Sequence, residues 1–211
     1  LAELTGARLH LAHISTAGSV RMVREAKARG LKVTAEACPH HFTLTEELTR
    51  GYNTHAKMNP PLRTMQDVQA IKEGLRDGTI DVIATDHAPH ATQEKQQEFT
   101  EAPFGIVGLE TALSLTLALV DEGVLTLESA VDKLATAPAK AFSLNAGTLA
   151  VGALADVAIV DPNREWQVDP SRFRSKSRNT PFAGWKVKGR VTTTIVSGRV
   201  VFELDRSERQ A

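Results

Sequence analysis

Residue types that bind metals or transfer protons occur at three points where an apolar segment of the sequence ends. His13 ends the first segment, Glu36 ends the second and is followed by His40 and His41, and Asp86 ends the third. An imidazole and a carboxylate carried on separate neighbouring strands are suitable ligands for a divalent metal such as zinc. We therefore predict that His13 and Asp86 converge on one metal ion.

Each of these residues also has a purely structural interpretation. A single histidine at a strand end more often makes a structural hydrogen bond, and an aspartate there often caps the next helix. His40 and His41 are adjacent, so in an extended segment their side chains point to opposite sides and at most one faces the site. His10 lies three residues before His13, so we expect it to face the other side of the strand.

Two further segments are suited to hold a small molecule. Asn59 stands before two prolines that restrict its backbone, and it is either a rigid amide for a substrate or a turn residue. Phe104 and Gly105 close a polar loop, where glycine lets a ligand approach the backbone closely, although a simple turn explains this pair equally well. Glu94 and Lys95 are expected on the solvated face of the same loop.

The elements that must position these residues alternate between strand and helix, which is typical of a parallel sheet with crossover helices. Apolar and β-branched runs predict strands at residues 8–14, 32–37 and 80–85. Helical periodicity predicts helices near residues 19–29, 65–76, 109–121 and 127–135, and a short helix from Pro138. In such folds the carboxyl ends of the strands collect the functional residues, so the three strand ends should meet.

The pattern changes after Gly147. Short β segments at residues 153–161, 191–196 and 199–203 follow one another without a helix, and Ser197–Gly198 is suited to a two-residue hairpin turn. We therefore predict an α/β part over residues 1–147 and a small β domain over residues 148–211.

Composition excludes several classes of function. The chain has 25 Lys and Arg against 25 Asp and Glu, with 42% hydrophobic residues, which is ordinary for a globular protein. No apolar run approaches the roughly 20 residues that span a bilayer, so a membrane protein is excluded. No basic stripe is present to neutralise phosphates, so a nucleic-acid partner is not expected. The one cysteine, Cys38, fits a reducing cytoplasm.

The chain is shorter than a complete (β/α)₈ barrel. A complete (β/α)₈ barrel takes about 250 residues, whereas this chain has 211 and begins at Leu1 rather than at a methionine. We therefore expect it to be the C-terminal segment of a larger chain.

Six motifs in order resemble the bacterial dihydroorotases of the amidohydrolase superfamily. They are HIST at 13–16, EACPHHFTLT at 36–45, KMNPPLR at 57–63, GTIDVIATDHAPH at 78–90, APFGIVGLET at 102–111 and KSRNTPFAGW at 176–185. The motif TDHAP alone also recurs in hydantoinases and allantoinases, but ATDHAPH together with KMNPPLR favours dihydroorotase.

The resemblance implies the C-terminal part of a metal-dependent (β/α)₈ barrel, about strands six to eight, with part of a small β-sandwich domain. It implies two Zn²⁺ ions per intact site, with His13 and Asp86 as ligands and Asp86 as the catalytic proton shuttle. It also implies that Asn59, His90, Phe104 and Gly105 contact the substrate. The family's first-strand His-x-His, bridging carboxylate and further histidine ligand do not occur in this sequence. We therefore expect the chain alone neither to close a barrel nor to bind two zinc ions tightly.

The resemblance further implies reversible ring closure of N-carbamoyl-L-aspartate to L-dihydroorotate and water in pyrimidine synthesis. Two alternatives stay open: another cyclic amidohydrolase such as allantoinase or dihydropyrimidinase, or a catalytically dead homologue that scaffolds aspartate transcarbamoylase. Expected partners are the small-molecule substrate and either a second copy in a homodimer or aspartate transcarbamoylase.

Overall fold

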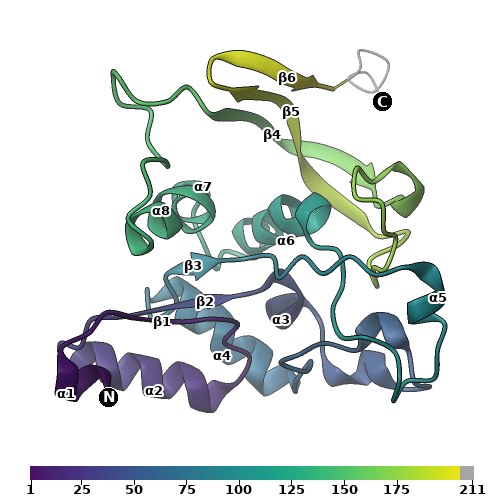
Figure 1. The fold of residues 1–211 in the computed structure, drawn as a ribbon, viewed down its shortest axis with the longest axis horizontal. Coiled ribbons are helices and arrows are strands. Elements are labelled where there is room, and N and C mark those ends of the chain that lie inside the picture. Colours follow the sequence, from purple (N-terminus) through teal and green to yellow (C-terminus); the bar gives the residue numbers. More distant parts are fainter. Residues whose placement is uncertain (205–211) are drawn as a thin grey trace.

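Three short parallel strands form the first sheet of the computed structural model, which describes residues 1–204 (Figure 1). The strands are β1 (Leu9–Leu11), β2 (Val33–Ala37) and β3 (Val82–Ile83), and β2 lies between the other two. The central strand is almost entirely buried, because it pairs on both sides and is covered by helices. The predicted alternation of strand and helix is confirmed, although each strand is shorter than predicted.

Two amphipathic helices cover one face of this sheet. They are α2 (Ala17–Ala28), which follows β1, and α4 (Met65–Arg76), which precedes β3 (Figure 1). Both begin at a threonine whose hydroxyl accepts a backbone N–H of the first turn. The helices pack closely at Gly74, where an added Cβ would lie 3.0 Å from Val20. Apolar residues at helical spacing, such as Val20 and Ile71, join the common core.

The remaining helical segments follow β2 and β3. Between β2 and α4 lie α3 (Pro39–Thr43), η1 (Glu46–Thr49) and η2 (Thr54–Ala56). After β3 come α5 (Thr92–Lys95), α6 (Leu109–Asp121), α7 (Leu127–Val131), η3 (Asp132–Thr136) and α8 (Ala137–Ala141). The short helix α1 (Ala2–Thr5) precedes β1, and η4 (Pro170–Arg172) follows β4. The segment η3 is a π-helical turn that joins α7 to α8. The two helices predicted here are therefore continuous, and the widened turn precedes Pro138, which has no N–H to donate. None of the helices in residues 1–204 is long and apolar enough to cross a membrane.

The second sheet is antiparallel and contains β4 (Val157–Gln167), β5 (Lys186–Val196) and β6 (Arg199–Glu203). The predicted hairpin is confirmed, with Ser197 and Gly198 at φ values of 49° and 77° in the left-handed region. Strand β4 extends past Pro162, where the sequence indicated a stop, because a register shift between Asp161 and Glu165 accommodates the proline. Residues 205–211 of the predicted β domain lie outside the described residues.

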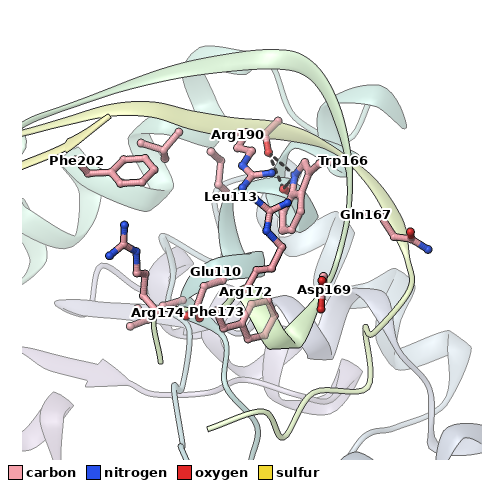
Figure 2. A pocket seen from close by; sticks show the side chains of 14 residues that line it. Glu110, Leu113, Trp166, Gln167, Asp169, Arg172, Phe173, Arg174, Arg190 and Phe202 are labelled. Atoms are coloured by element: carbon pink, nitrogen blue, oxygen red, sulfur yellow. Dashed lines mark hydrogen bonds between the residues drawn. The ribbon is translucent and has the colours of Figure 1, made fainter. Parts of the chain in front are cut away.

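Helix α6 connects the two sheets. The Trp166 ring on β4 donates its Nε1–H to Ser114 Oγ (3.1 Å) on α6 and to Gly189 O (3.0 Å) on β5 (Figure 2). The Arg190 guanidinium lies over the same ring, 5.0 Å from its centroid. A cavity of about 230 Å³ remains between α6 and the sheet. None of the predicted metal or substrate residues lines it, so it is separate from the site described below.

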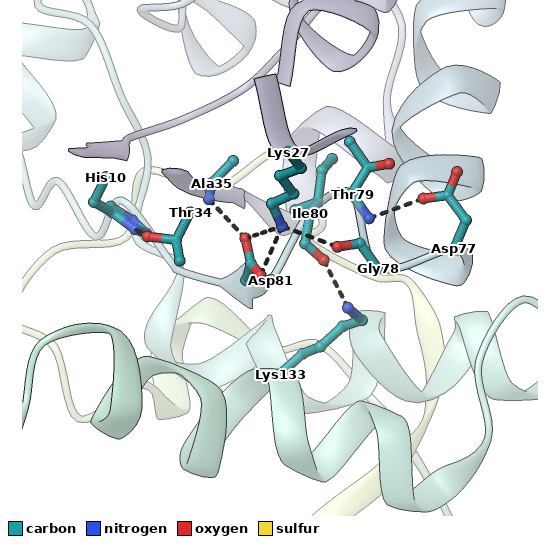
Figure 3. Close-up of polar contacts among 10 residues, drawn as sticks. All are labelled: His10, Lys27, Thr34, Ala35, Asp77, Gly78, Thr79, Ile80, Asp81 and Lys133. Atoms are coloured by element: carbon teal, nitrogen blue, oxygen red, sulfur yellow. Dashed lines mark hydrogen bonds and ion pairs between the residues drawn. The ribbon is translucent and has the colours of Figure 1, made fainter. Parts of the chain in front are cut away.

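Hydrogen bonds and an ion pair join the amino end of β3 to β2, α2 and η3 (Figure 3). Both Asp81 carboxylate oxygens lie 2.7 Å from Lys27 Nζ on α2, and Oδ2 also accepts the backbone N–H of Ala35 on β2 (2.8 Å). Lys133 Nζ, from η3, donates to Ile80 O (2.6 Å). Asp81 therefore links a strand to its neighbour and to the helix that covers both.

We predict that Asp81→Ala lowers the free energy of unfolding by about 2–3 kcal/mol, because it leaves the Ala35 N–H unpaired and Lys27 without its carboxylate. Asp81→Asn keeps an acceptor for Ala35 and loses only the ion pair, so its loss should be smaller. Urea unfolding of both variants measures the difference. Equal losses in the two variants would contradict the role given to the Ala35 hydrogen bond.

Candidate metal and substrate site

The two predicted metal ligands share an unusual backbone conformation. His13 lies two residues beyond β1 at φ 56°, and Asp86 lies three residues beyond β3 at φ 48°. Residues other than glycine are uncommon in this left-handed region, and each costs about 1–3 kcal/mol unless its surroundings hold it there. Such strain gathers at functional sites, where it directs a side chain that regular structure would point elsewhere.

The His13 and Asp86 side chains meet as the sequence predicted. His13 Nε2 lies 3.7 Å from Asp86 Oδ1, and both side chains are about one-third exposed (31% and 28%). Two ligand atoms that each lie about 2.0–2.2 Å from a zinc ion are separated by no more than about 4.3 Å. The spacing and the chemistry of this donor pair therefore fit a shared divalent metal.

The buried Glu36 carboxylate orients the His13 ring. Its Oε1 lies 2.9 Å from His13 Nδ1, and its Oε2 lies 3.1 Å from His10 Nε2. A carboxylate at Nδ1 orients the ring of a metal-binding histidine, and here Nε2 is the ring nitrogen that lies near Asp86. The expectation that His10 faces away from His13 is wrong, because β1 ends at Leu11 and the left-handed turn at His13 breaks the alternation of the strand.

Cys38, His40 and His41 form a second group of metal-binding residue types, with ligand atoms all within 4.8 Å of one another. The prediction that at most one of the two histidines faces the site assumed an extended chain, and that assumption is wrong. Pro39 begins the short helix α3 instead, and both rings are buried with centroids 4.2 Å apart.

The protonation states of this group follow from burial. Burial lowers the pKa of His40 and His41, so both rings are neutral, which is the form that ligates metals. Burial raises the pKa of the Cys38 thiol far above its ordinary value, and the Asp86 and Glu36 carboxylates raise it further. The Cys38 thiol is therefore protonated, so a metal would have to displace its proton to bind here.

The predicted substrate residues lie on segments that contact one another. His90 Nε2 is 2.8 Å from Phe104 O, and the Gly105 N–H donates to Lys57 O (2.8 Å), two residues before Asn59. Phe104 and Asn59 are exposed. The structure therefore brings the Asn59 segment to the Gly105 turn, and within residues 1–204 no hydrogen bond joins the Asn59 side chain to another residue.

A glycine is required at position 105 both by its backbone conformation and by the close packing around it. Its φ of 100° is open to glycine alone, and an added Cβ would lie 2.5 Å from the Cβ of Ala88. The glycine therefore allows the 104–105 turn to lie directly against the segment that carries His90.

Residues 3–201 match the amidohydrolase family. The chain belongs to this family. It is 61% identical over 204 residues to a dihydroorotase of Syntrophotalea carbinolica, an alignment that covers 97% of this chain and 48% of the relative. The chain thus spans about half the length of the curated relatives it matches.

The solved structures with the same fold include hydantoinases and an inactive dihydroorotase-like domain. The L-hydantoinase (dihydropyrimidinase) from Arthrobacter aurescens is 33% identical with a TM-score of 0.89, over 95% of this chain and 46% of that chain. The inactive dihydroorotase-like domain of a Chaetomium thermophilum CAD-like multifunctional protein is 25% identical with a TM-score of 0.71, over 94% of this chain and 52% of that chain. The predicted fold class, α/β with the C-terminal part of an amidohydrolase barrel, is confirmed.

The pair formed by His13 and Asp86 has fewer donors than a catalytic zinc site needs. A catalytic zinc takes three protein ligands and keeps one position open, whereas His13 and Asp86 bring two donors together and Cys38, His40 and His41 form a separate group. Further ligands must come from residues outside the pair if the metal is to be held tightly.

The sequence analysis predicted the wrong environment for one buried polar residue near the proposed substrate segments and gave no role to two others. Lys95 was expected in solvent but is 3% exposed, while Lys57 and Asn179 received no role and are 8% and 3% exposed. Lys57 and Asn179 lie inside the motifs KMNPPLR and KSRNTPFAGW. Their place in these motifs was the one available signal.

We predict that Glu36→Ala weakens metal binding about 10–100-fold, because the His13 ring loses the carboxylate that sets its orientation. His13→Ala should abolish binding at the same position. Metal content after titration with a competing chelator, on the complete gene product, measures both effects. Glu73→Ala, an exposed change on α4, is the matched control, and a Glu36→Ala protein that behaves like this control would contradict the prediction.

Proposed function

We propose that this chain supplies the C-terminal half of a dihydroorotase active site, which interconverts N-carbamoyl-L-aspartate and L-dihydroorotate with loss or gain of water. The observation that carries the proposal is the approach of His13 Nε2 to Asp86 Oδ1 at 3.7 Å, with Glu36 fixed behind the ring. The substrate assignment is supported by the 61% identity to a dihydroorotase, against 33% to a hydantoinase.

Asp86 is the proposed catalytic residue. Hydrolysis of dihydroorotate breaks the ring C–N bond, so one proton must move from the attacking water to the departing nitrogen. The Asp86 carboxylate is partly exposed beside His13, where it can accept this proton and deliver it to the nitrogen. In the reverse direction the same carboxylate returns the proton to the leaving water.

His13 and Asp86 would hold a divalent metal in the complete site. When bound, such an ion supplies a water nucleophile at neutral pH and polarises the scissile carbonyl. We assign zinc, two ions per intact site, because imidazole and carboxylate are common zinc ligands. The remaining ligands of both ions lie outside the described residues.

Asn59, His90 and the Phe104–Gly105 backbone are the proposed substrate contacts. Asn59 offers an exposed amide with both a donor and an acceptor. His90 and Phe104 are held against each other at 2.8 Å, so the substrate meets one preformed surface. Positioning of this kind can lower a barrier by several kcal/mol.

The wider assignments follow from the same proposal. Residues 1–147 form the barrel portion and residues 148–211 the small β domain. The enzyme acts in pyrimidine biosynthesis in the cytoplasm, as the single buried Cys38 thiol supports. It forms a homodimer or associates with aspartate transcarbamoylase.

A prediction for the proton shuttle is that Asp86→Ala lowers the rate in both directions by at least about 100-fold while leaving the fold intact. The readout is dihydroorotate hydrolysis and carbamoyl-aspartate cyclisation by the complete gene product, with circular dichroism to check folding. Asp121→Ala, which removes a surface carboxylate on α6, should leave both rates unchanged. Near-normal turnover by Asp86→Ala would remove it from the mechanism.

Substrate choice separates the main proposal from its alternatives. We expect kcat/KM for dihydroorotate to exceed that for hydantoin, dihydrouracil and allantoin. A preference for one of the latter would make the protein another cyclic amidohydrolase. A metal-free protein without turnover of any of them would favour the catalytically dead scaffold; the Chaetomium domain is an inactive relative with this fold.

A further inference from the structure

The side chain of Asn179 joins two of the proposed substrate segments. Its Nδ2 donates to Ala88 O (2.9 Å) and to Gly105 O (3.2 Å), while its Oδ1 accepts the N–H of His90 (3.2 Å). The residue is 3% exposed and comes from the segment that precedes β5. One buried amide therefore fixes the His90 segment against the Phe104–Gly105 turn.

Lys57 joins the third segment to the same turn by two routes. Its carbonyl oxygen accepts the Gly105 N–H (2.8 Å), and its Nζ donates to Thr100 O (3.0 Å) and Ala102 O (2.5 Å). The ammonium group also lies 4.6 Å from the centroid of the Phe104 ring. Because Asn59 is two residues further along the chain, Lys57 ties its segment to the turn.

Lys95 also donates hydrogen bonds to the loop that contains Phe104 and Gly105. Its Nζ donates to Pro103 O (2.8 Å) and Gly105 O (3.2 Å). Burial and the neighbouring Lys57 ammonium lower the pKa of Lys95 to about 8. The buried ammonium groups of Lys57 and Lys95 thus bind four carbonyl oxygens between residues 100 and 105. These oxygens therefore point into the protein.

These bonds leave one backbone group of the turn for a ligand. Gly105 N–H, Gly105 O and Phe104 O are all engaged within the protein. Within residues 1–204, the Phe104 N–H has no protein acceptor, and its ring is 52% exposed. The turn is therefore arranged to present one N–H donor beside a half-exposed aromatic ring.

We propose that Asn179 and Lys57 are positioning residues that lock the three substrate segments into one rigid surface and present the Phe104 N–H to the substrate. The chemistry presented suits an acceptor oxygen of a cyclic amide whose ring lies against the exposed Phe104 side chain. The kinetic part of this inference rests on the proposed dihydroorotase function, whereas its structural part does not.

Asn179→Asp and Lys57→Met test the proposal in the complete gene product. Asn179→Asp keeps the shape and the acceptor for His90 but places an oxygen against two carbonyl oxygens. Lys57→Met keeps the aliphatic stem and removes the donors, so it serves where Asn179→Asp fails to fold. Lys133→Met is the matched control, because Lys133 is equally buried (6% against 8% exposed) and also caps a carbonyl, Ile80 O, at the opposite end of β3.

In both test variants we expect KM for dihydroorotate to rise about tenfold or more, with a smaller change in kcat and unchanged metal content. Hydrogen exchange should accelerate within residues 57–59 and 86–108 and much less in the rest of the fold. Lys133→Met should change neither KM nor exchange in those segments, whatever it does to the Tm. An unchanged KM, or faster exchange spread evenly over the fold, would overturn the proposal.

The two measurements separate this inference from the proposed function. If the unmodified protein does not turn over dihydroorotate, the proposed function fails, and exchange within residues 86–108 still decides the structural role. If the protein is active but exchange there is unaffected in both variants, the positioning inference alone fails.

Discussion

Glu36 holds His13 in a conformation that the chain would not adopt unaided. Its carboxylate binds Nδ1 of the His13 ring (2.9 Å), and its backbone oxygen accepts the N–H of Ile14 (2.8 Å). Ring and backbone are therefore fixed by one residue of the neighbouring strand. A left-handed histidine costs about 1–3 kcal/mol and persists where its surroundings determine it from more than one side. The direction of His13 Nε2, and so its approach to Asp86, depends on this contact.

Asp86 is held by different means. The chain after it runs beside the segment that precedes α6, where the Ala88 N–H donates to Ile106 O (2.8 Å) and the Gly108 N–H reaches His87 Nδ1 (3.1 Å). Gly108 leaves no room for a side chain, since an added Cβ would lie 2.8 Å from Thr85 O. Both proposed metal ligands are thus held by backbone that fits closely to a neighbouring segment, so their positions do not depend on a bound ligand.

The sequence predicted the residues at the strand ends because periodicity and residue type are local signals. Alternating strands and helices, the Ser197–Gly198 hairpin and the meeting of His13 with Asp86 all follow from such signals. The positions of His10, His40 and His41 could not be predicted in this way, since they depend on where β1 ends and on Pro39 starting a helix. Lys95 was misplaced for a related reason: a charged residue in a polar loop is usually exposed, and only the folded loop supplies carbonyl oxygens to its ammonium group.

The proposed metal ligands and the proposed substrate segments differ in how much they depend on the rest of a barrel. Three parallel strands bring together the two proposed metal ligands and leave the outer edges of β1 and β3 without a strand partner within residues 1–204. The substrate segments, by contrast, are bound to one another through buried bonds of Asn179 and Lys57 and need no further strand to hold them. Metal affinity should therefore depend strongly on the strands that complete the barrel, because each missing ligand removes a bond to the ion. The substrate surface depends on them much less, because its rigidity is internal to this half.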